Sequence, residues 1–167
     1  MQTQRLLIRN YEPRDLDDFY EIFSDPIVME QCEPAYDREK AAHQLRFFID
    51  RPIAYAVVET RSGKMIGHAL FQQMPGEAEG IYEIGWIYNR SFWRRGYAYE
   101  ASRALIDYGF SRLGLHKVVA ETIDPVKYAT LMQKLGMKPE GVFRLHTRDN
   151  GGKWADVYWY GVLKEDR

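Results

Sequence analysis

Two arginines and a glycine, Arg94, Arg95 and Gly96, stand directly ahead of a segment with the pattern of a helix. The first turn of a helix leaves backbone N–H groups without partners and carries roughly half a positive charge. Arginines add positive charge there, and glycine lets a ligand approach the backbone. This combination is typical of a phosphate or diphosphate site, although solvated arginines before a simple turn would give the same pattern.

The common nucleotide-binding fingerprints are missing from this helix mouth. Neither G-x-G-x-x-G, typical of dinucleotide binding, nor G-x-x-x-x-G-K-[ST], typical of nucleoside triphosphatases, occurs in the sequence. We therefore expect a phosphate-bearing ligand of another class.

Size and charge narrow the possible functions. The chain has 167 residues and a net charge of -1, which suits one domain and argues against a general nucleic-acid or membrane-surface binder. The single cysteine, Cys32, excludes an intrachain disulfide and a cysteine-rich zinc site, and we interpret it as a packed thiol. No apolar run has the length of a signal peptide or a membrane span. We predict a cytoplasmic protein without a nucleic-acid or membrane partner.

Hydrophobic spacing and turn residues predict the elements that must position the helix mouth. Strands are expected at residues 5–9, 53–59, 65–73 and 81–88, within 113–123, and at 141–149 and 154–163. Helices are expected at residues 12–25, after the N-cap Asp37, at 97–112 and at 124–136. The order is mixed α/β without repeats or a long linker, which indicates a single domain over residues 1–167.

Gly85 interrupts the strand at residues 81–88. A glycine inside a strand often marks a bulge or a close approach to the backbone. The strand that leads into the helix mouth is therefore expected to be irregular.

The sequence from Glu83 to Phe110, EIGWIYNRSFWRRGYAYEASRALIDYGF, resembles the acetyl-coenzyme A (acetyl-CoA) motif of the GNAT superfamily of N-acetyltransferases. The family signature Q/R-x-x-G-x-G/A is matched by WRRGYA, from Trp93 to Ala98. The aromatic residue and basic pair are most similar to the branch of ribosomal-protein N-terminal (alanine/serine) acetyltransferases. The opening strand and helix, the first hairpin and the later helix also resemble the family in order, so the resemblance covers nearly the whole chain.

This resemblance implies a single GNAT-type α/β domain. Its mixed, mostly antiparallel sheet would be flanked by helices and splayed at the central strand. Acetyl-CoA would serve as co-substrate, and no metal would be needed. The implied cofactor-binding residues are the strand edge and the helix mouth: Trp86, Ile87, Tyr88, Arg94, Arg95, Gly96, Tyr97, Ala98 and Tyr99. The side chains of Trp86 and Tyr88 could equally belong to the core.

The implied reaction is direct attack of a neutral amine on the acetyl thioester. Removing a proton at pH 7 costs about 4–5 kcal/mol for a lysine side chain but only about 1 kcal/mol for an α-amine. Glu83 matches a carboxylate often found at this position in the resembling branch and is the candidate base, although it could be an ordinary strand residue. His68, expected on the neighbouring strand, is a weaker candidate.

The sequence departs from the family after the later strand. The family has Asn and Ser in the pattern Asn-x-x-Ser, where the serine serves the leaving thiolate, and this chain has Pro125 and Tyr128. Many members place a tyrosine four residues before Gly136, where this chain has Met132. Tyr128 is the remaining candidate proton donor, or else it packs on the pantetheine arm.

Several alternatives stay open. The acceptor could be a protein N-terminus, a polyamine, an amino acid or another small amine, with Glu33 and Asp156 among the acidic residues that could attract it. The missing Asn and Ser allow a sensing module that binds CoA without turnover. A nucleotide-binding regulator is a further alternative. The protein is expected to be a monomer or a homodimer.

Overall fold

The computed structural model describes residues 1–167, without the side chain of Ala129. Seven strands form one sheet in the order β1-β2-β3-β4-β5-β7-β6. Its strands are β1 (Leu6–Arg9), β2 (Ala54–Glu59), β3 (Met65–Gln73), β4 (Ile81–Tyr88), β5 (Lys117–Thr122), β6 (Lys138–Arg148) and β7 (Trp154–Leu163). Its α-helices are α1 (Leu16–Phe23), α2 (Arg38–Asp50), α3 (Tyr97–Tyr108) and α4 (Pro125–Lys134). The predicted alternation of strands and helices is confirmed.

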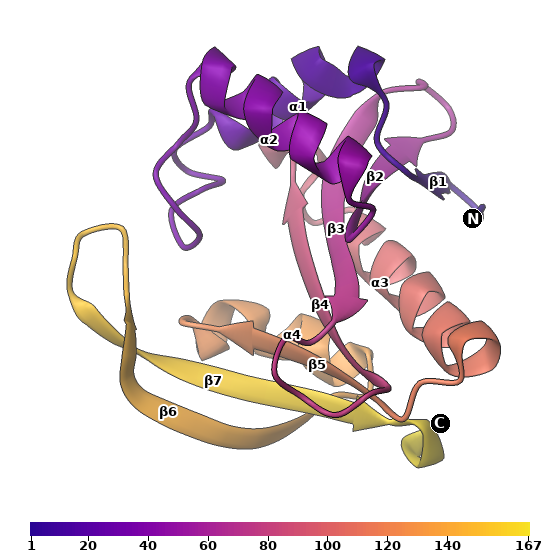
Figure 1. The fold of residues 1–167 in the computed structure, drawn as a ribbon, viewed down its shortest axis with the longest axis vertical. Helices are drawn as coiled ribbons and strands as arrows, with labels where there is room; N and C mark the ends of the chain where they lie inside the picture. Colours follow the sequence, from indigo (N-terminus) through magenta and orange to yellow (C-terminus); the bar gives the residue numbers. More distant parts are fainter.

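Strand alternation separates two hydrophobic cores on opposite faces of the sheet. On β2, the side chain of Val57 belongs to the core under α3 and α4, whereas those of Ala56 and Val58 belong to the core under α1 and α2. In Figure 1 the α1–α2 pair lies at the top, α3 at the right and the long hairpin of β6 and β7 at the bottom. Helices therefore cover both faces of the sheet, as in a mixed α/β domain.

The sheet parts between β4 and β5. All strand pairs are antiparallel except β4 and β5, and this parallel pair is joined at three positions, which run from Ile81 opposite Lys117 to Glu83 opposite Val119. Beyond Glu83 the two strands no longer pair. This gap is the predicted splay of the central strand.

Gly85 does not form a bulge. The pairing of β3 with β4 runs without interruption from Gly67 opposite Tyr88 to Gln73 opposite Tyr82, with Gly85 opposite Leu70. The irregularity of β4 therefore lies on the side that faces β5, where the sheet opens.

Local signals explain where most helices and turns begin. Asp37 caps α2 by accepting a hydrogen bond from the Lys40 amide at 2.7 Å, as predicted. Gly63 has the expected left-handed conformation in the β2–β3 turn, with φ of 71°. The helix predicted to reach residue 112 is α-helical only to Tyr108, and residues 109–113 continue it as a π-helical segment.

The structure also bears on membranes and metals. Within the described residues, no helix combines the length and apolar character needed to cross a bilayer. Among the same residues, no group of three or more His, Cys, Asp or Glu side chains is placed to hold a metal ion.

Candidate active site

The loop before α3 turns its backbone sharply at two residues. Arg94 and Gly96 adopt left-handed conformations, with φ of 60° and 80°, and α3 begins at Tyr97. Turns of this kind expose successive N–H groups and form concave sites for anions. Trp93 holds the loop against β4, because its indole Nε1 donates to the Tyr88 carbonyl at 2.7 Å. The helix mouth therefore has a backbone conformation that suits an anion.

A cleft of about 600 Å³ lies along the gap and ends at this helix mouth. The predicted cofactor-binding residues that line it are Trp86, Ile87, Tyr88, Arg94, Gly96, Tyr97, Ala98 and Tyr99. Arg95 is not among them, and its guanidinium lies 5.3 Å from the centre of the Phe92 ring. Lys127 and Lys134 of α4 also line the cleft and add positive charge.

Only every second residue of β4 points its backbone N–H and C=O groups toward the gap. The Asn89 amide, directly after β4, donates to the Ile66 carbonyl of β3 at 2.9 Å. Backbone groups alternate along a strand, so those of Ile87 also face β3, while those of Trp86 and Tyr88 face the gap. Ile87, predicted to lie on this edge, therefore contributes to the cleft lining without a free backbone edge.

The side chains of Trp86 and Tyr88 differ in burial. Tyr88 is buried, and its ring packs so closely on Gly67 that an added Cβ there would lie 2.5 Å from a ring carbon. Trp86 is half-buried and makes an edge contact with the Tyr128 ring at 6.4 Å between centres. Tyr88 is thus a core side chain, and Trp86 forms part of the cleft wall.

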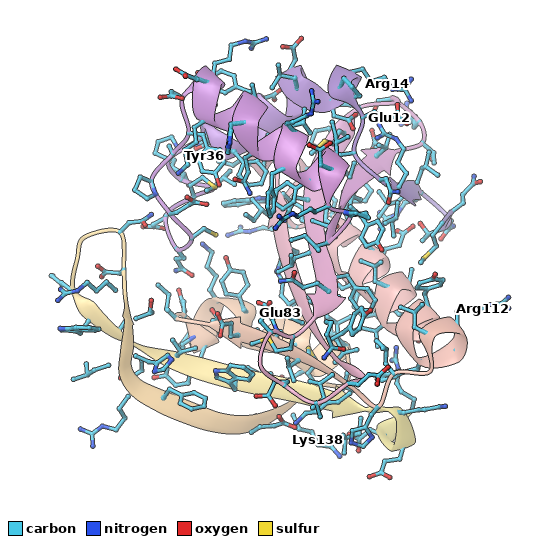
Figure 2. The ribbon with its side chains drawn as sticks, in the orientation of Figure 1. Glu12, Arg14, Tyr36, Glu83, Arg112 and Lys138 are labelled. Atoms are coloured by element: carbon cyan, nitrogen blue, oxygen red, sulfur yellow. The ribbon has the colours of Figure 1, made fainter. Side chains whose placement is uncertain are left out.

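A second cavity of about 240 Å³ meets this cleft where the strands part. Cys32, Trp86, Ile87 and Tyr128 line both. Glu83 lines only the second cavity, and Figure 2 shows it near the centre of the molecule. Two cavities that join at the gap could hold two reactants with their reacting groups side by side.

Two carboxylates share this second cavity. Glu83 pairs with Val119 across the parallel strands, so Glu121, two residues further along β5, lies on the same face just beyond the last pairing. Glu121 is an exposed residue of β5, and its partial desolvation raises the pKa of its carboxyl group, as does the neighbouring Glu83 carboxylate. Glu83 is half-buried, and Gln72 donates to it at 3.4 Å. The cavity therefore favours a positively charged or hydrogen-donating guest.

Tyr128 lies on the first turns of α4 at the junction of the two cavities. Burial raises the pKa of its phenol to about 12, with smaller contributions from Cys32, Asp124 and Glu30. The hydroxyl therefore remains protonated throughout the physiological range and can act as a hydrogen-bond donor.

His68 is poorly suited to act as a base. It is 6% exposed, and its Nδ1 shares a hydrogen bond of 2.7 Å with the Tyr11 hydroxyl. Burial lowers the pKa of His68 to about 3, so the imidazole is neutral and weakly basic.

Three other sequence interpretations need correction. Cys32 is exposed rather than packed. Glu33 binds Tyr36 and Lys40, and the Asp156 carboxylate accepts from the Leu145 amide at 2.8 Å. Neither acidic residue lines the two cavities, because internal contacts hold both of them elsewhere.

The sequence interpretation missed several cavity residues. Glu121 and Lys127 were not singled out, nor was Gln31, whose amide nitrogen donates to Asp124 at 2.9 Å while its buried Oε1 accepts nothing in the described structure. A carboxylate at the end of the apolar run VVAE was the available signal for Glu121.

Comparison with known proteins identifies the family to which this fold belongs. The sequence model of the acetyltransferase (GNAT) domain matches residues 5–138. The chain belongs to the GNAT family. It is 34% identical to the uncharacterized N-acetyltransferase YnaD of Bacillus subtilis (strain 168), over 98% of this chain and 96% of YnaD. As a GNAT family member with N-acetyltransferase relatives, it is an acetyl-CoA-dependent N-acetyltransferase.

Solved GNAT structures share the fold over the whole chain. The acetyltransferase (GNAT family) from Bacillus anthracis superposes with a TM-score of 0.91 at 30% identity and covers 99% of this chain and 98% of its own. The ribosomal-protein-S5-alanine acetyltransferase from Vibrio fischeri superposes with a TM-score of 0.82 at 18% identity, covering 99% and 97%. The second likeness is one of fold.

Proposed function

We propose that this GNAT enzyme transfers the acetyl group of acetyl-CoA to a primary amine that binds in the cavity of Glu83 and Glu121. A protein N-terminal α-amine or a small amine is the proposed acceptor. One observation carries the proposal: β4 parts from β5 where the anion-binding cleft meets a cavity with two carboxylates.

The cleft fits acetyl-CoA by its chemistry. The amides from Gly96 to Tyr99 would hold the diphosphate, with Lys127 adding positive charge. The backbone edge at Trp86 and Tyr88 that faces the gap would pair with the amides of the pantetheine arm, as an added strand would. When bound, acetyl-CoA supplies an acetyl group activated as a thioester. The helix mouth and the strand edge together fix its direction along the gap.

Glu83 is the proposed base. It faces the acceptor cavity, where it could remove a proton from the incoming ammonium directly or through a water molecule. Glu121 would also attract that ammonium group, because both carboxylates lie on one face of the sheet. An α-amine needs the weaker base and therefore suits this cavity better than a lysine side chain.

Tyr128 is the proposed donor to the departing sulfur. It stands at the junction of the two cavities, and its raised pKa keeps the proton on oxygen. In this role Tyr128 replaces the serine that the family pattern has at this position.

Release of free thiol from acetyl-CoA tests the proposal. Candidate amines are peptides with N-terminal alanine or serine, spermidine, free amino acids and an Nα-blocked lysine peptide. We expect release only when an amine is present, with an α-amine peptide preferred over the blocked lysine peptide at pH 7. Tight binding of CoA without release from any amine would instead support a sensing module. Stabilisation by ATP or NAD as large as that by acetyl-CoA would favour a nucleotide regulator.

Glu83→Gln tests the base. We expect kcat to fall roughly 100-fold at pH 7, because a positioned base contributes about 10²–10⁴ in rate. Part of the loss should be recovered as the pH approaches the pKa of the free amine. Glu79→Gln, the same chemical change in the exposed loop before β4, is the matched control and should leave kcat unchanged. Equal rates for the two variants would contradict the role of Glu83.

A further inference from the structure

Arg5 contacts the proposed anion-binding loop, residues 94–97, on the side away from the cleft. It lies just before β1, and its Nη1 donates to the Arg95 carbonyl at 2.9 Å. The guanidinium also stacks over the Tyr97 ring, 4.5 Å from its centre. Arg5 does not line the cleft of about 600 Å³, so it reaches the loop from the side opposite the cleft.

Glu100, in the first turn of α3, fixes the position of Arg5. Its Oε2 accepts from Arg5 Nε at 2.6 Å, and its Oε1 accepts from the Arg5 amide at 2.8 Å and from the Thr3 hydroxyl at 2.6 Å. Burial alone would raise the pKa of Glu100, but these hydrogen bonds outweigh it and lower that pKa. The carboxylate is thus ionised and fully engaged with Thr3 and Arg5. Its negative charge is therefore paired with the Arg5 guanidinium.

The contact with the Arg95 carbonyl sets the direction of the next amide. The chain has no cis peptide bond, and in a trans peptide the C=O and N–H point in opposite directions. Because the Arg95 carbonyl points toward Arg5, the Gly96 N–H must point away from it. The left-handed conformations of Arg94 and Gly96 on either side place this peptide in a sharp turn, where the Arg5 contact fixes its orientation.

We propose that Arg5 is a positioning residue for acetyl-CoA: held by Glu100, it anchors the Arg95 carbonyl and thereby aims the Gly96 N–H at the diphosphate. The inference rests on the proposed binding of the diphosphate at this loop. It assigns to a residue ahead of β1 a part in cofactor affinity, although Arg5 lies outside the cleft.

Arg5→Lys is the first test, because lysine keeps the charge but cannot reach Glu100 and the Arg95 carbonyl with one planar group. We expect the KM for acetyl-CoA to rise roughly tenfold, as for one lost charge-assisted hydrogen bond, with kcat and the KM of the amine nearly unchanged. Acetyl-pantetheine, which lacks the diphosphate, should react equally well with both proteins. An unchanged KM for acetyl-CoA, or an equal loss with acetyl-pantetheine, would overturn the inference.

Glu100→Gln separates positioning from simple charge. If Arg5 acts by anchoring the loop, this variant also raises the KM for acetyl-CoA, and the double variant is no worse than Arg5→Lys alone. If Arg5 acted only as a positive charge near the diphosphate, removing the carboxylate would lower that KM. A lowered KM, or additive effects, would therefore reject the anchoring role.

Arg9→Lys is the matched control. Arg9 lies on β1 and forms two hydrogen bonds of 2.7 Å with Asp15, away from the loop. We expect it to lower the melting temperature at least as much as Arg5→Lys while leaving the KM for acetyl-CoA unchanged. A wild-type protein that neither binds nor cleaves acetyl-CoA would refute the proposed function itself, whereas an active wild type with an indifferent Arg5→Lys refutes only the role of Arg5.

Discussion

The raised pKa of the Tyr128 phenol limits how this residue can assist the departing thiolate. A phenol with a pKa of about 12 is some 3–4 units less acidic than a typical thiol, so complete proton transfer to a thiolate would cost about 5 kcal/mol. Donation of a hydrogen bond needs no such transfer. The residue can therefore stabilise developing charge on sulfur while keeping its proton.

We expect Tyr128→Phe to lower kcat roughly tenfold at saturating acetyl-CoA, less than the about 10²–10⁴ typical of a general acid. Tyr108→Phe, on the exposed part of α3, is the control and should have no effect. Steady-state kinetics at saturating amine provides the measurement. A loss below twofold would show that Tyr128 only packs on the pantetheine arm.

His68 links the stability of the fold to pH. In the unfolded chain a histidine binds a proton below about pH 6.5, whereas folded His68 stays neutral until its pKa of about 3. Between these values the unfolded state binds more protons, so stability falls as the pH is lowered. One such group contributes a slope of up to about 1.4 kcal/mol per pH unit.

His68→Gln should remove this slope, because glutamine does not titrate yet can still accept a hydrogen bond from Tyr11. We expect the difference in unfolding free energy between wild type and variant to shrink as the pH falls from 7 to 5. Urea denaturation across this range measures it, with the exposed His43→Gln as control. Parallel curves for wild type and His68→Gln would contradict the buried neutral state.

At the scale of elements, helix α3 and its π-helical extension lie between two glycines that serve different purposes. Gly96 precedes the helix with φ of 80°, and Gly114 follows the extension with φ of 69°. Alanine at either position would adopt the left-handed conformation at a cost of about 1–2 kcal/mol. An added Cβ would meet Arg5 at 3.5 Å at Gly96 and nothing within 4 Å at Gly114.

We expect Gly96→Ala and Gly114→Ala to lose similar stability, about 1 kcal/mol each. Only Gly96→Ala should raise the KM for acetyl-CoA, by roughly tenfold or more, because only Gly96 belongs to the anion-binding loop. Thermal denaturation and steady-state kinetics on both variants provide the comparison. A similar KM for the two variants would place the diphosphate elsewhere.

The elements themselves were largely predictable from sequence, since their signals are local. Apolar spacing, the cap at Asp37 and the turn at Gly63 depend on neighbouring residues, and each was confirmed. The partnership of Glu83 with Glu121 was not predictable, because it depends on the register of two strands far apart in the chain. The anchoring contact of Arg5 with the Arg95 carbonyl likewise appears only after folding.

At the scale of the whole molecule, a contact between distant parts of the chain holds a loop that lines the proposed acceptor cavity. The loop between α1 and α2, which includes Gln31 and Cys32, accepts a hydrogen bond at its Met29 carbonyl from Asn150 of the β6–β7 turn at 2.9 Å. Gln31 ties the same loop to Asp124 at the start of α4 at 2.9 Å. The acceptor cavity therefore depends on contacts between distant parts of the chain.

We expect Asn150→Ala to raise the KM of the amine roughly fivefold while leaving the KM for acetyl-CoA unchanged, because one net hydrogen bond is worth about 1 kcal/mol. Lys153→Ala, an exposed position at the same turn, is the control. Initial rates with each substrate varied in turn distinguish the two constants. Equal changes in both constants would show that the contact supports the fold in general.

The gap between β4 and β5 limits the stability that the sheet can reach. A sheet that closed fully there would gain ladder hydrogen bonds for the amides of Trp86 and Tyr88, which do not pair with β5. Such a variant would be more stable and, in the proposed binding mode, would leave no strand edge for acetyl-CoA. In the proposed binding mode, the stretch of β4 that would receive acetyl-CoA is the stretch without ladder hydrogen bonds, so cofactor binding and stability oppose each other there.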